Sequence, residues 1–387
     1  MSEWKKVLVK DLGKIVTGHT PPTKEKKFYG DFMPFIKPTD ISKDEKYTYN
    51  PEQYYSKEAA EKYKSSLIPK GATCVVCIGT IGEKMTMAHC DLFTNQSINS
   101  IIPSNDYDPD FVYYLLKYNL NKVKSLNKGT ASGREFVSKS TFLEMPIMVC
   151  ENKDKQIRIG SILSHYDSLI ENYQRQIKLL EEAAQRLYKE WFVDLHFPGY
   201  ENTKIVDGVP EGWEKKNITE IYSFNYGKNL STKFVQAKGK YPVYGASGII
   251  GFYSEANCYE KVILVTSRGN GSGDIHRTYQ NNCYITNNSF LVKPNESFEY
   301  CHNPFTYFFL KHANFRLVRT GAAQPQLTNS SIATVDVLLP EKKQIEIYCN
   351  LTDTIFDTID VLYKQLRLLT EALDRLLPKL MSGEIEV

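Results

Sequence analysis

The motif most suggestive of chemistry is a glycine-rich loop that follows an apolar stretch. Val262–Val265 leads into Gly269-Asn-Gly-Ser-Gly273, as at the entry to a nucleotide or S-adenosylmethionine fold. A helix should open directly after such a loop. Residues 275–288 are instead polar, rich in aromatic and β-branched residues and without a helical period, and Asp274 stands where the motif needs glycine. The sequence therefore argues against a cofactor fold at this loop.

Two further motifs resemble parts of catalytic sites. Asn303-Pro-Phe305 approaches the Asn-Pro-Pro-Phe loop of adenine methyltransferases, but it lacks the second proline and opens a predicted helix. Glu151-Asn-Lys153 resembles half of a nuclease Glu-x-Lys motif, but no Asp precedes it at suitable spacing, so a helix cap is the simpler interpretation. No His, Ser or Cys constellation indicates a hydrolase. We predict no catalytic residue in this chain.

The cysteines offer metal chemistry at one place only. Cys74-Val-Val-Cys77 has CxxC spacing, but it lies in the apolar, β-branched stretch Thr73–Ile78. On a strand, residues three apart face opposite sides of the sheet, and no second CxxC exists to complete a zinc site. We predict no metal and interpret the cysteines as small buried hydrophobic residues.

Polar, glycine-containing segments are the remaining candidates for a functional site. Glycine lets a backbone approach a ligand, Arg pairs well with guanine, and Asn or Gln pairs well with adenine in the major groove. The same residue types also dominate ordinary turns, so both interpretations stay open for any one segment. The segments are Thr17–Pro22, Lys37–Asp40, Gly79–Gly82, Thr94–Ser97 and Gly129–Arg134, then Tyr244–Gly248, Ser267–Asp274, Thr286–Ser289 and Arg319–Gln326.

The distribution of charge favours a polyanionic partner. The net charge is only +3. Residues 1–150 carry 21 Lys and Arg against 17 Asp and Glu, and residues 200–340 carry 14 against 11, whereas residues 151–199 and 341–387 carry 7 against 8 and 6 against 9. Two basic regions separated by acidic segments suit two contacts with DNA, because phosphate neutralisation provides most sequence-independent affinity.

The elements that position these segments are arranged as an internal repeat. Trp4–Leu12 returns as Trp213–Ile221, Phe111–Lys117 as Phe305–Lys311, and the helical Lys178–Leu187 as Arg367–Leu376. The offset drifts from 209 to 194 and 189, as expected for small insertions and deletions in loops. Each copy is a globule followed by a helix.

The helical part of each copy has the period of a coiled coil. In the second copy the apolar seam consists of Ile359, Leu362, Leu366, Leu369, Leu373, Leu376 and Leu380. In the first copy it consists of Tyr166, Leu169, Tyr173, Ile177, Leu180, Ala184, Leu187 and Trp191, with an extra step of four at Ile177 that we interpret as a stutter. Such a helix rises roughly 54 Å over about 36 residues and overhangs a globule of about 140 residues, so it needs a partner helix.

Connectivity predicts the direction of pairing. The second globule begins near Pro198, where the first helix ends, and finishes near Pro340, where the second helix begins. Only antiparallel helices bring these two points together, because parallel helices would hold them roughly 50 Å apart. We therefore expect a dumbbell with two similar heads on a rigid two-helix spacer. No stretch has the 18 or more apolar residues of a membrane span, and the N-terminus lacks a signal peptide, so we expect a cytoplasmic protein.

The ordered motifs resemble the specificity (S) subunits of type I restriction-modification enzymes over essentially the whole chain. The most specific pieces are Leu187-Tyr-Lys-Glu-Trp-Phe-Val-Asp-Leu-His-Phe-Pro-Gly199 and Val209-Pro-Glu-Gly-Trp213. Shorter segments resemble two classes of target recognition domain. Those that resemble one class are Thr17–Pro21, Tyr29–Gly30, Gly79–Gly82 and Asn95–Ser97. Those that resemble another class are Tyr244–Gly251, Arg268–Asp274 and Asn287–Phe290.

The resemblance implies an α+β fold with two pseudo-repeated mixed α/β target recognition domains, separated by two long helices that form an antiparallel coiled coil. The domains would be residues 1–150 and 196–340, and the spacer helices 151–195 and 341–387. Each head would read one half of an asymmetric bipartite DNA target, and the helices would set the gap between the halves. Two methyltransferase (M) subunits would dock on the helices and bind S-adenosylmethionine, and restriction (R) subunits would bring ATP- and Mg-dependent translocation and cleavage. The chain itself would hold no cofactor.

Twelve residues are our candidates for DNA contact. They are Thr20, Lys37, Gln96, Ser132 and Arg134 in the first head, and Tyr244, Ser247, Arg268, Asn270, Asn287, Arg319 and Gln324 in the second. We expect Arg134 and Arg268 to read bases and Lys37 and Arg319 to bind phosphates. Two alternatives remain: a scaffold that joins proteins without touching DNA, and a self-contained modification enzyme, which the broken glycine motif disfavours.

Overall fold

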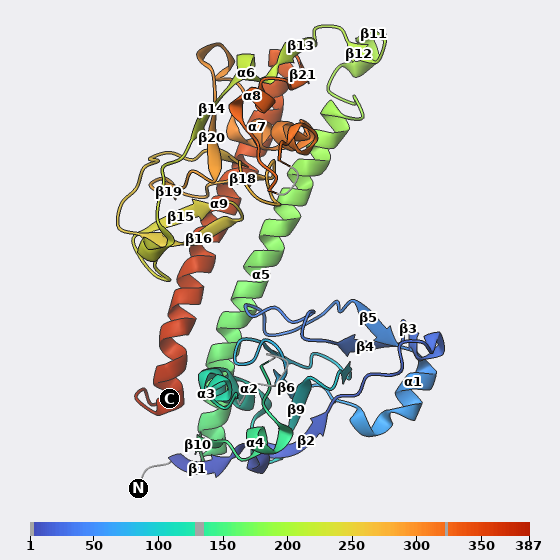
Figure 1. Cartoon of the computed structure of the whole chain (residues 1–387), viewed down its shortest axis with the longest axis vertical. Coiled ribbons are helices and arrows are strands. Elements are labelled where there is room, and N and C mark those ends of the chain that lie inside the picture. The colour runs from blue at the N-terminus through green and yellow to red at the C-terminus, as the bar shows by residue number, and fades with distance from the viewer. Residues whose placement is uncertain (1–3, 128–134, 322–323) are drawn as a thin grey trace. The chain divides into compact units, whose positions relative to one another are not determined.

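The computed structural model describes residues 4–127, 135–321 and 324–387. The chain forms two compact units, unit 1 from residues 1–172 and 367–387, and unit 2 from residues 173–366. Two long helices, α5 (Lys153–Phe192) and α9 (Lys342–Ser382), cross this division, so each unit contains part of both (Figure 1).

Unit 1 is built on two four-stranded sheets. The first has the order β2-β9-β6-β7 and the second β3-β5-β4-β8, in which only β4 and β8 run parallel. Strand β1 pairs with β10. The strands are β1 (Trp4–Leu8), β2 (Gly13–Thr17), β3 (Tyr29–Gly30), β4 (Met33–Ile36), β5 (Gln53–Tyr55), β6 (Thr73–Val76), β7 (Met85–Met87), β8 (Phe93–Thr94), β9 (Ile98–Pro103) and β10 (Pro146–Cys150), and the short helices are α1 (Lys57–Lys62), α2 (Pro109–Tyr118), α3 (Leu120–Ser125) and α4 (Lys139–Leu143).

Unit 2 repeats this plan. A four-stranded sheet has the order β14-β20-β17-β18, a three-stranded sheet the order β16-β15-β19, and β13 pairs with β21. A small hairpin of β11 and β12 precedes them. The strands are β11 (Ile205–Val206), β12 (Val209–Pro210), β13 (Glu214–Asn217), β14 (Tyr222–Tyr226), β15 (Tyr241–Gly245), β16 (Gly248–Tyr253), β17 (Ile263–Thr266), β18 (Ile275–Arg277), β19 (Tyr284–Ile285), β20 (Ser289–Pro294) and β21 (Asp336–Leu339), and the short helices are α6 (Ile218–Ile221), α7 (Asn303–His312) and α8 (Asn329–Ile332).

The repeat extends to individual backbone hydrogen bonds. Gly79 N–H donates to the Glu135 carbonyl (3.0 Å) in unit 1, and Gly269 N–H donates to the Pro325 carbonyl (2.9 Å) in unit 2. The parallel pair β4–β8 likewise matches β15–β19. The internal repeat predicted from the sequence is therefore confirmed as two copies of one backbone topology.

Local sequence explains why these elements begin where they do. The Asp108 carboxylate accepts a hydrogen bond from Phe111 N–H (2.9 Å), and Pro109 follows it, which together start α2. Strand β6 is buried along its whole length, as its β-branched, apolar composition suggests for a central strand.

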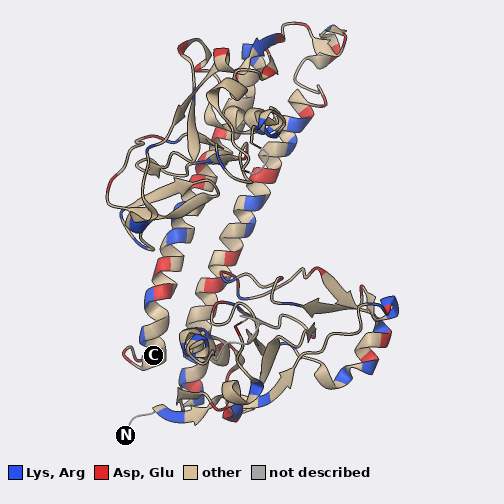
Figure 2. Cartoon of the chain, viewed as in Figure 1, with Lys and Arg blue, Asp and Glu red and all other residues tan. Residues whose placement is uncertain are grey.

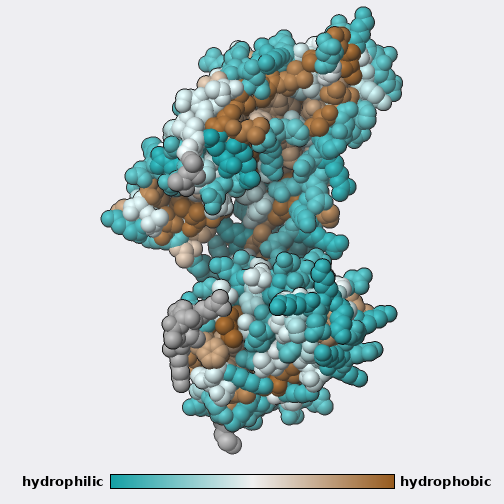
Figure 3. Space-filling model, turned by 45° about the vertical axis from the view of Figure 1, so that its right-hand side comes forward, coloured by the Kyte–Doolittle hydropathy of each residue, from teal (hydrophilic) through white to brown (hydrophobic). Residues whose placement is uncertain are grey.

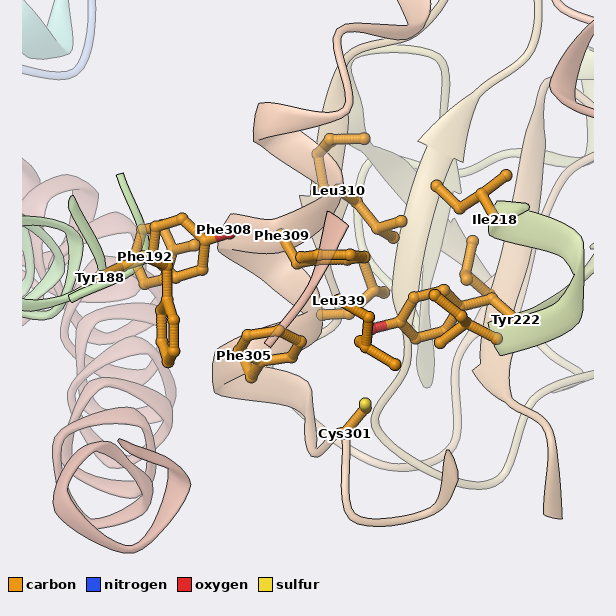
Figure 4. Packing of buried hydrophobic residues seen from close by; sticks show 14 of the residues in the cluster. Tyr188, Phe192, Ile218, Tyr222, Cys301, Phe305, Phe308, Phe309, Leu310 and Leu339 are labelled. Atoms are coloured by element: carbon orange, nitrogen blue, oxygen red, sulfur yellow. The ribbon is translucent and has the colours of Figure 1, made fainter. Parts of the chain in front are cut away.

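The core of unit 2 joins α7 to both long helices (Figure 4). The Phe192 ring of α5 lies 5.3 Å from the rings of Phe305 on α7 and Tyr348 on α9, measured between centroids. The Trp213 indole N–H donates to Gln344 Oε1 on α9 (2.9 Å). Aromatic packing of this kind buries large apolar areas, so the sheet region and both helices of unit 2 share one core.

The two long helices run antiparallel in unit 2. The Tyr348 hydroxyl donates to the Ala184 carbonyl (3.0 Å), and Ile177 packs in a cluster with Ile359 and Leu362. Residue numbers thus fall along α5 as they rise along α9. The predicted antiparallel direction is confirmed within this unit.

One detail of the predicted seam is wrong. Leu169 is 43% exposed, whereas Ile170 is buried at 7% exposure. Counting Ile170 instead of Leu169, the steps from Tyr166 to Trp191 alternate between four and three without interruption. Leu and Ile at neighbouring positions are equally apolar, so only packing shows which one is buried.

The surface along both long helices carries charged residues together with exposed apolar ones such as Leu179, Leu351 and Val361. Figure 2 shows Lys and Arg interspersed with Asp and Glu on α5 and α9, and the face in Figure 3 is mostly hydrophilic with separate hydrophobic patches. Among the described residues, no helix has both the length and the hydropathy that a membrane crossing requires.

Candidate nucleic-acid interface

Four loops of unit 2 are tied together at one end of its sheets. The Thr266 hydroxyl donates to the Ala246 carbonyl (2.7 Å), and the Ser267 hydroxyl donates to the Asn287 carbonyl (3.2 Å). Arg268 forms an antiparallel bridge with Gln326. We call residues 245–248, 267–274, 286–289, 316–321 and 324–326 the loop edge of unit 2. The strands therefore bring segments from four parts of the chain into one surface.

The loop edge gathers most of the predicted contacts of the second head. Ser247, Arg268, Asn270 and Gln324 are exposed, and Asn287 is half-buried. Within the described part of the chain, no ion pair or side-chain hydrogen bond engages the Arg268 guanidinium. This group is thus available to an external acceptor without first breaking an internal contact.

Arg319 is held differently from Arg268. Its Nη1 donates to the Asn270 carbonyl (3.2 Å) and its Nε to the Arg316 carbonyl (3.1 Å). Arg316 in turn forms an ion pair with Asp274 (2.6 Å). These contacts brace the segment 316–319 against the loop 267–274. Arg319 consequently has a structural role at the loop edge, and its phosphate contact stays a prediction.

The burial of Tyr244 contradicts the prediction that this residue contacts DNA. Its side chain is 1% exposed and packs in a core cluster with Cys258, Leu264 and Ile285. Its hydroxyl accepts a hydrogen bond from the Tyr279 N–H (3.3 Å). A ring enclosed in this way cannot reach a base edge. The sequence placed Tyr244 beside an exposed turn, but the inward face of β15 decides its direction.

Unit 1 has an equivalent loop edge, formed by residues 18–20, 77–82, 94–97 and 135–137. His19 N–H donates to the Thr94 carbonyl (2.8 Å), and Cys77 N–H donates to the Ser97 carbonyl (2.8 Å). The Thr20 hydroxyl donates to Gln96 Oε1, so the structure brings these two candidates together. Ser132 and Arg134 lie outside the described residues.

Lys37 is partly engaged. Its Nζ forms an ion pair with Glu52 (2.6 Å), and the lysine side chain is 23% exposed. The hydrogen bond that Lys37 Nζ donates to the Glu52 carboxylate is the main cause of the lowered pKa of Glu52. A DNA phosphate would have to compete with this carboxylate, which is exposed and therefore weakly held.

Leu317 is a candidate that the sequence analysis missed. It is 80% exposed, the largest value among the exposed large hydrophobic residues, and it lies between Arg316 and Arg319 on the loop edge. Apolar side chains beside basic ones are used by DNA-binding proteins to contact thymine methyl groups or to enter a base step. The signal in the sequence was this flanking pair of arginines, but only the fold shows that Leu317 points outward.

The motifs considered for enzymatic chemistry serve as structural elements. The glycine-rich loop runs into strand β18 instead of a helix, which removes the helix N-terminus that binds a cofactor phosphate. Asn303 opens α7, and its side-chain amide donates to the Lys261 carbonyl (3.0 Å). Asn152 Oδ1 accepts from Lys155 N–H (3.1 Å) at the start of α5, so this motif caps a helix.

The structure does not form a metal centre in the residues that it describes. No group of three or more His, Cys, Asp or Glu side chains is placed to hold an ion there. Cys74 and Cys77 are buried on β6 and at its end, and burial raises the pKa of their thiols to about 12 and about 11. Burial on an apolar strand agrees with the interpretation of these two cysteines as small buried hydrophobic residues.

Comparisons with known proteins agree with this architecture. The model of the type I restriction modification DNA specificity domain matches residues 1–182 and again residues 210–376. The MjaIX specificity subunit of Methanocaldococcus jannaschii, a type I restriction enzyme subunit, is 27% identical over 418 residues, which cover 100% of this chain and 94% of that protein. A putative type I specificity subunit of Mycoplasma genitalium, S.MgeORF438P, is 26% identical, and the alignment covers 82% of this chain and 82% of that protein.

A solved structure supports the fold as well. The crystal structure of a type I restriction-modification S subunit from M. genitalium matches with a TM-score of 0.63 at 20% identity, covering 97% of this chain and 96% of that one. At this identity the likeness concerns the fold alone. The two family-model matches together span most of the chain, and it therefore belongs to the family of type I restriction-modification DNA specificity subunits.

Proposed function

We propose that each loop edge reads one half of a bipartite DNA target. The observation that carries this proposal is the duplicated specificity domain, in which each copy presents an equivalent edge of polar loops. The two edges differ in chemistry: Arg268 precedes Gly269 in unit 2, whereas Ile78 precedes the equivalent Gly79 in unit 1. Different side chains at equivalent places read different bases, so the target is asymmetric.

The functional boundaries that we propose are residues 1–150 and 196–340 for the target recognition domains. Residues 151–195 and 341–387 then contain the spacer helices α5 and α9. These boundaries differ from those of the compact units because each long helix is shared between two units. The paired helices set the gap between the two half-sites.

The chain is a DNA-specificity subunit and depends on partners for catalysis. We propose that two M subunits dock on the helices and carry adenine methylation with S-adenosylmethionine, and that R subunits add ATP- and Mg-dependent cleavage. The assembly then acts as an adenine-specific methyltransferase and endonuclease in the cytoplasm. Exposed apolar residues on the helices, such as Leu179, Leu351 and Val361, support docking there.

The test is the adenine methylome of a methylation-free host that expresses this chain with its neighbouring methyltransferase gene. Single-molecule sequencing is run beside a host with the methyltransferase alone. We expect a split, asymmetric motif that is methylated only when this chain is present, and it reports both half-sites and their gap. No methylation from a soluble complex with an intact methyltransferase would contradict the proposal and favour a protein scaffold.

A further inference from the structure

A buried arginine connects the sheet of unit 2 to the spacer helix α9. Arg277 ends strand β18 and is 5% exposed. Its Nη1 donates to Asp360 Oδ1 on α9 at 2.7 Å. The second oxygen of Asp360 accepts from Lys261 Nζ, also at 2.7 Å. A single carboxylate on the helix is thus held by two cations from the head.

Aromatic rings enclose the guanidinium of Arg277. Its central carbon lies 4.7 Å from the ring centroid of Tyr279 and 4.5 Å from that of Phe356 on α9. The Tyr279 ring stacks on Tyr363 of the same helix, with centroids 3.5 Å apart. Arginine is planar and bonds in fixed directions, so this arrangement permits few relative orientations of β18 and α9.

The contact costs desolvation that apolar residues would avoid. The Nη2 of Arg277 is buried and has no hydrogen-bond partner among the described residues. Replacing a buried ion pair with well-packed apolar residues is often neutral or stabilising. Stability alone therefore does not account for Arg277 and Asp360, whereas a need for a defined orientation does.

Unit 1 places a cation at the corresponding junction by different means. Met87 of β7 is equivalent to Arg277, and Lys46 lies beside it, joined through the Met87 N–H to Lys46 carbonyl hydrogen bond (2.8 Å). Lys46 is buried, and its Nζ forms an ion pair with Asp110 of α2 (2.5 Å) and a hydrogen bond to Ser164 of α5 (2.7 Å).

The two copies therefore share a polar junction between sheet and spacer helix, although the cation comes from different segments. In unit 1 a second polar contact, from the Tyr114 hydroxyl to Asp167 of α5 (2.5 Å), reinforces it. Hydrophobic packing has no preferred direction, but these contacts do. The shared feature is a directional link from each head to its helix.

We infer that Arg277 with Asp360, and Lys46 with Ser164, are positioning residues that restrict the gap length accepted between the two half-sites. The inference rests on the proposed function. One added base pair moves a half-site by about 3.4 Å and rotates it by about 35°. Rejecting such a target requires each head to resist rotation on its helix, and the buried polar junctions supply that resistance.

The experiment uses the full complex with its methyltransferase and compares methylomes. In the double variant Arg277→Met/Asp360→Leu both charges are removed, and Lys261 retains its contact with Asp357 (3.3 Å). We expect thermal stability equal to or above that of the wild type. We also compare methylation at targets whose gap is one base pair too long or too short with methylation at targets that have the correct gap. The ratio of the first to the second should rise about tenfold, which equals about 1.4 kcal/mol.

The matched control is Lys215→Met/Asp336→Leu. This pair joins two strands of unit 2 at 3.1 Å, but its side chains are 75% and 50% exposed. It should leave the gap preference of the wild type intact. Arg277→Lys provides a second variant that keeps the charge and loses the fork, and it should loosen the gap preference as well.

An unchanged gap preference in Arg277→Lys and the double variant overturns the inference, as does equal loosening in the Lys215 and Asp336 control. Half-site bases must remain those of the wild type, because a positioning residue changes spacing and not base readout. If the wild-type chain directs no methylation at a split motif, the proposed function itself is contradicted. The two failures are therefore distinguishable.

Discussion

At the scale of single residues, Arg268 differs from the other arginines of the loop edge by being unengaged. Arg316 pairs with Asp274, and Arg319 donates to two backbone carbonyls. Arg268 is exposed, and none of the five N–H donors of its guanidinium is engaged among the described residues. These donors are therefore available to an external acceptor. Bidentate donation to guanine is the most common specific contact that arginine makes.

Arg268→Ala should lower affinity for the cognate site by about 1–3 kcal/mol and relax selectivity at one base position. Competition binding against duplexes substituted at each position measures both effects. Lys37→Ala serves as the contrast, because loss of a phosphate contact weakens all sequences alike. Unchanged base selectivity in the Arg268 variant would remove it from the list of base-reading residues.

Leu317 should matter for DNA and not for folding. Because its side chain is 80% exposed, Leu317→Ala should change the free energy of unfolding by less than about 0.5 kcal/mol. Burial against DNA is worth up to about 1.5–3 kcal/mol for a leucine, so we expect a loss of about 1 kcal/mol in binding. Tyr259→Ala, 70% exposed and outside the loop edge, is the control. Equal affinities of wild type and Leu317→Ala would contradict this role.

Glu181 gives a pH-dependent prediction. Burial raises its pKa above the ordinary 4.5, and nearby Arg277 and Lys311 lower it by less. A carboxyl with a higher pKa in the folded chain binds its proton more tightly there, so unfolding free energy falls as pH rises from 4.5 through the raised value. Glu181→Gln, which stays neutral, should therefore be more stable than the wild type at pH 7, and this advantage should shrink as the pH is lowered.

Urea unfolding at several pH values measures this difference. Glu182→Gln is the matched control at the adjacent position, where an ion pair with Arg186 spans 3.6 Å with the arginine 81% exposed. It should shift stability by less than about 0.5 kcal/mol at each pH. A constant gap between wild type and Glu181→Gln at all pH values would show that titration of Glu181 is not the cause.

At the scale of elements, one glycine in each unit allows the two sheets of that unit to meet. An added Cβ at Gly18 would lie closer than 3.0 Å to the carbonyl oxygens of Thr94 and Asn95, and one at Gly227 would lie equally close to those of Ile285 and Thr286. These residues are at equivalent places in the repeat. The end of β2 or β14 therefore approaches the neighbouring sheet too closely for any side chain.

Gly227→Ala should destabilise the protein by about 3 kcal/mol, the upper part of the range for overpacking. The atoms that would meet this Cβ belong to the backbone of Ile285 and Thr286, which cannot rotate away. Gly208→Ala is the control, because it has open space around it and a φ of +80°, and so only the left-handed backbone costs about 1–2 kcal/mol. Thermal unfolding compares them, and a smaller loss at Gly227 than at Gly208 would contradict the steric argument.

At the scale of the whole molecule, the charge distribution determines how binding responds to salt. The two recognition regions together carry a net charge of +7 and the helical regions −4. Released counterions make the logarithm of affinity fall with that of salt concentration by about 0.9 per phosphate contact. We expect a negative slope of several units for the full complex.

Lys37→Ala should reduce this slope by about one unit and weaken all sequences similarly. Lys364→Ala, exposed on α9, is the control and should not change it. Binding titrations at several salt concentrations give the slopes. If Lys37→Ala had the slope of the wild type, the Glu52 ion pair would be its only role, and the phosphate assignment would be wrong.

The sequence by itself determined the repeat, the two long helices, their antiparallel direction in unit 2 and the non-helical stretch after the glycine-rich loop. Each of these depends on order along the chain: a helical or strand period, a recurring motif, or the element that must follow a loop. Covalent geometry makes such patterns local, so neighbouring residues suffice to recognise them. The strand after the glycine-rich loop is a clear case.

Only the tertiary structure decided which side chains face outward and which contacts engage them. Tyr244 and Ser247 lie three residues apart, yet one is in the core and the other is exposed. Ile170 is buried, whereas its neighbour Leu169 is exposed. Arg277 and Asp360 are 83 positions apart and meet because β18 packs on α9. Burial and pairing depend on elements distant in sequence, and local composition does not encode their approach.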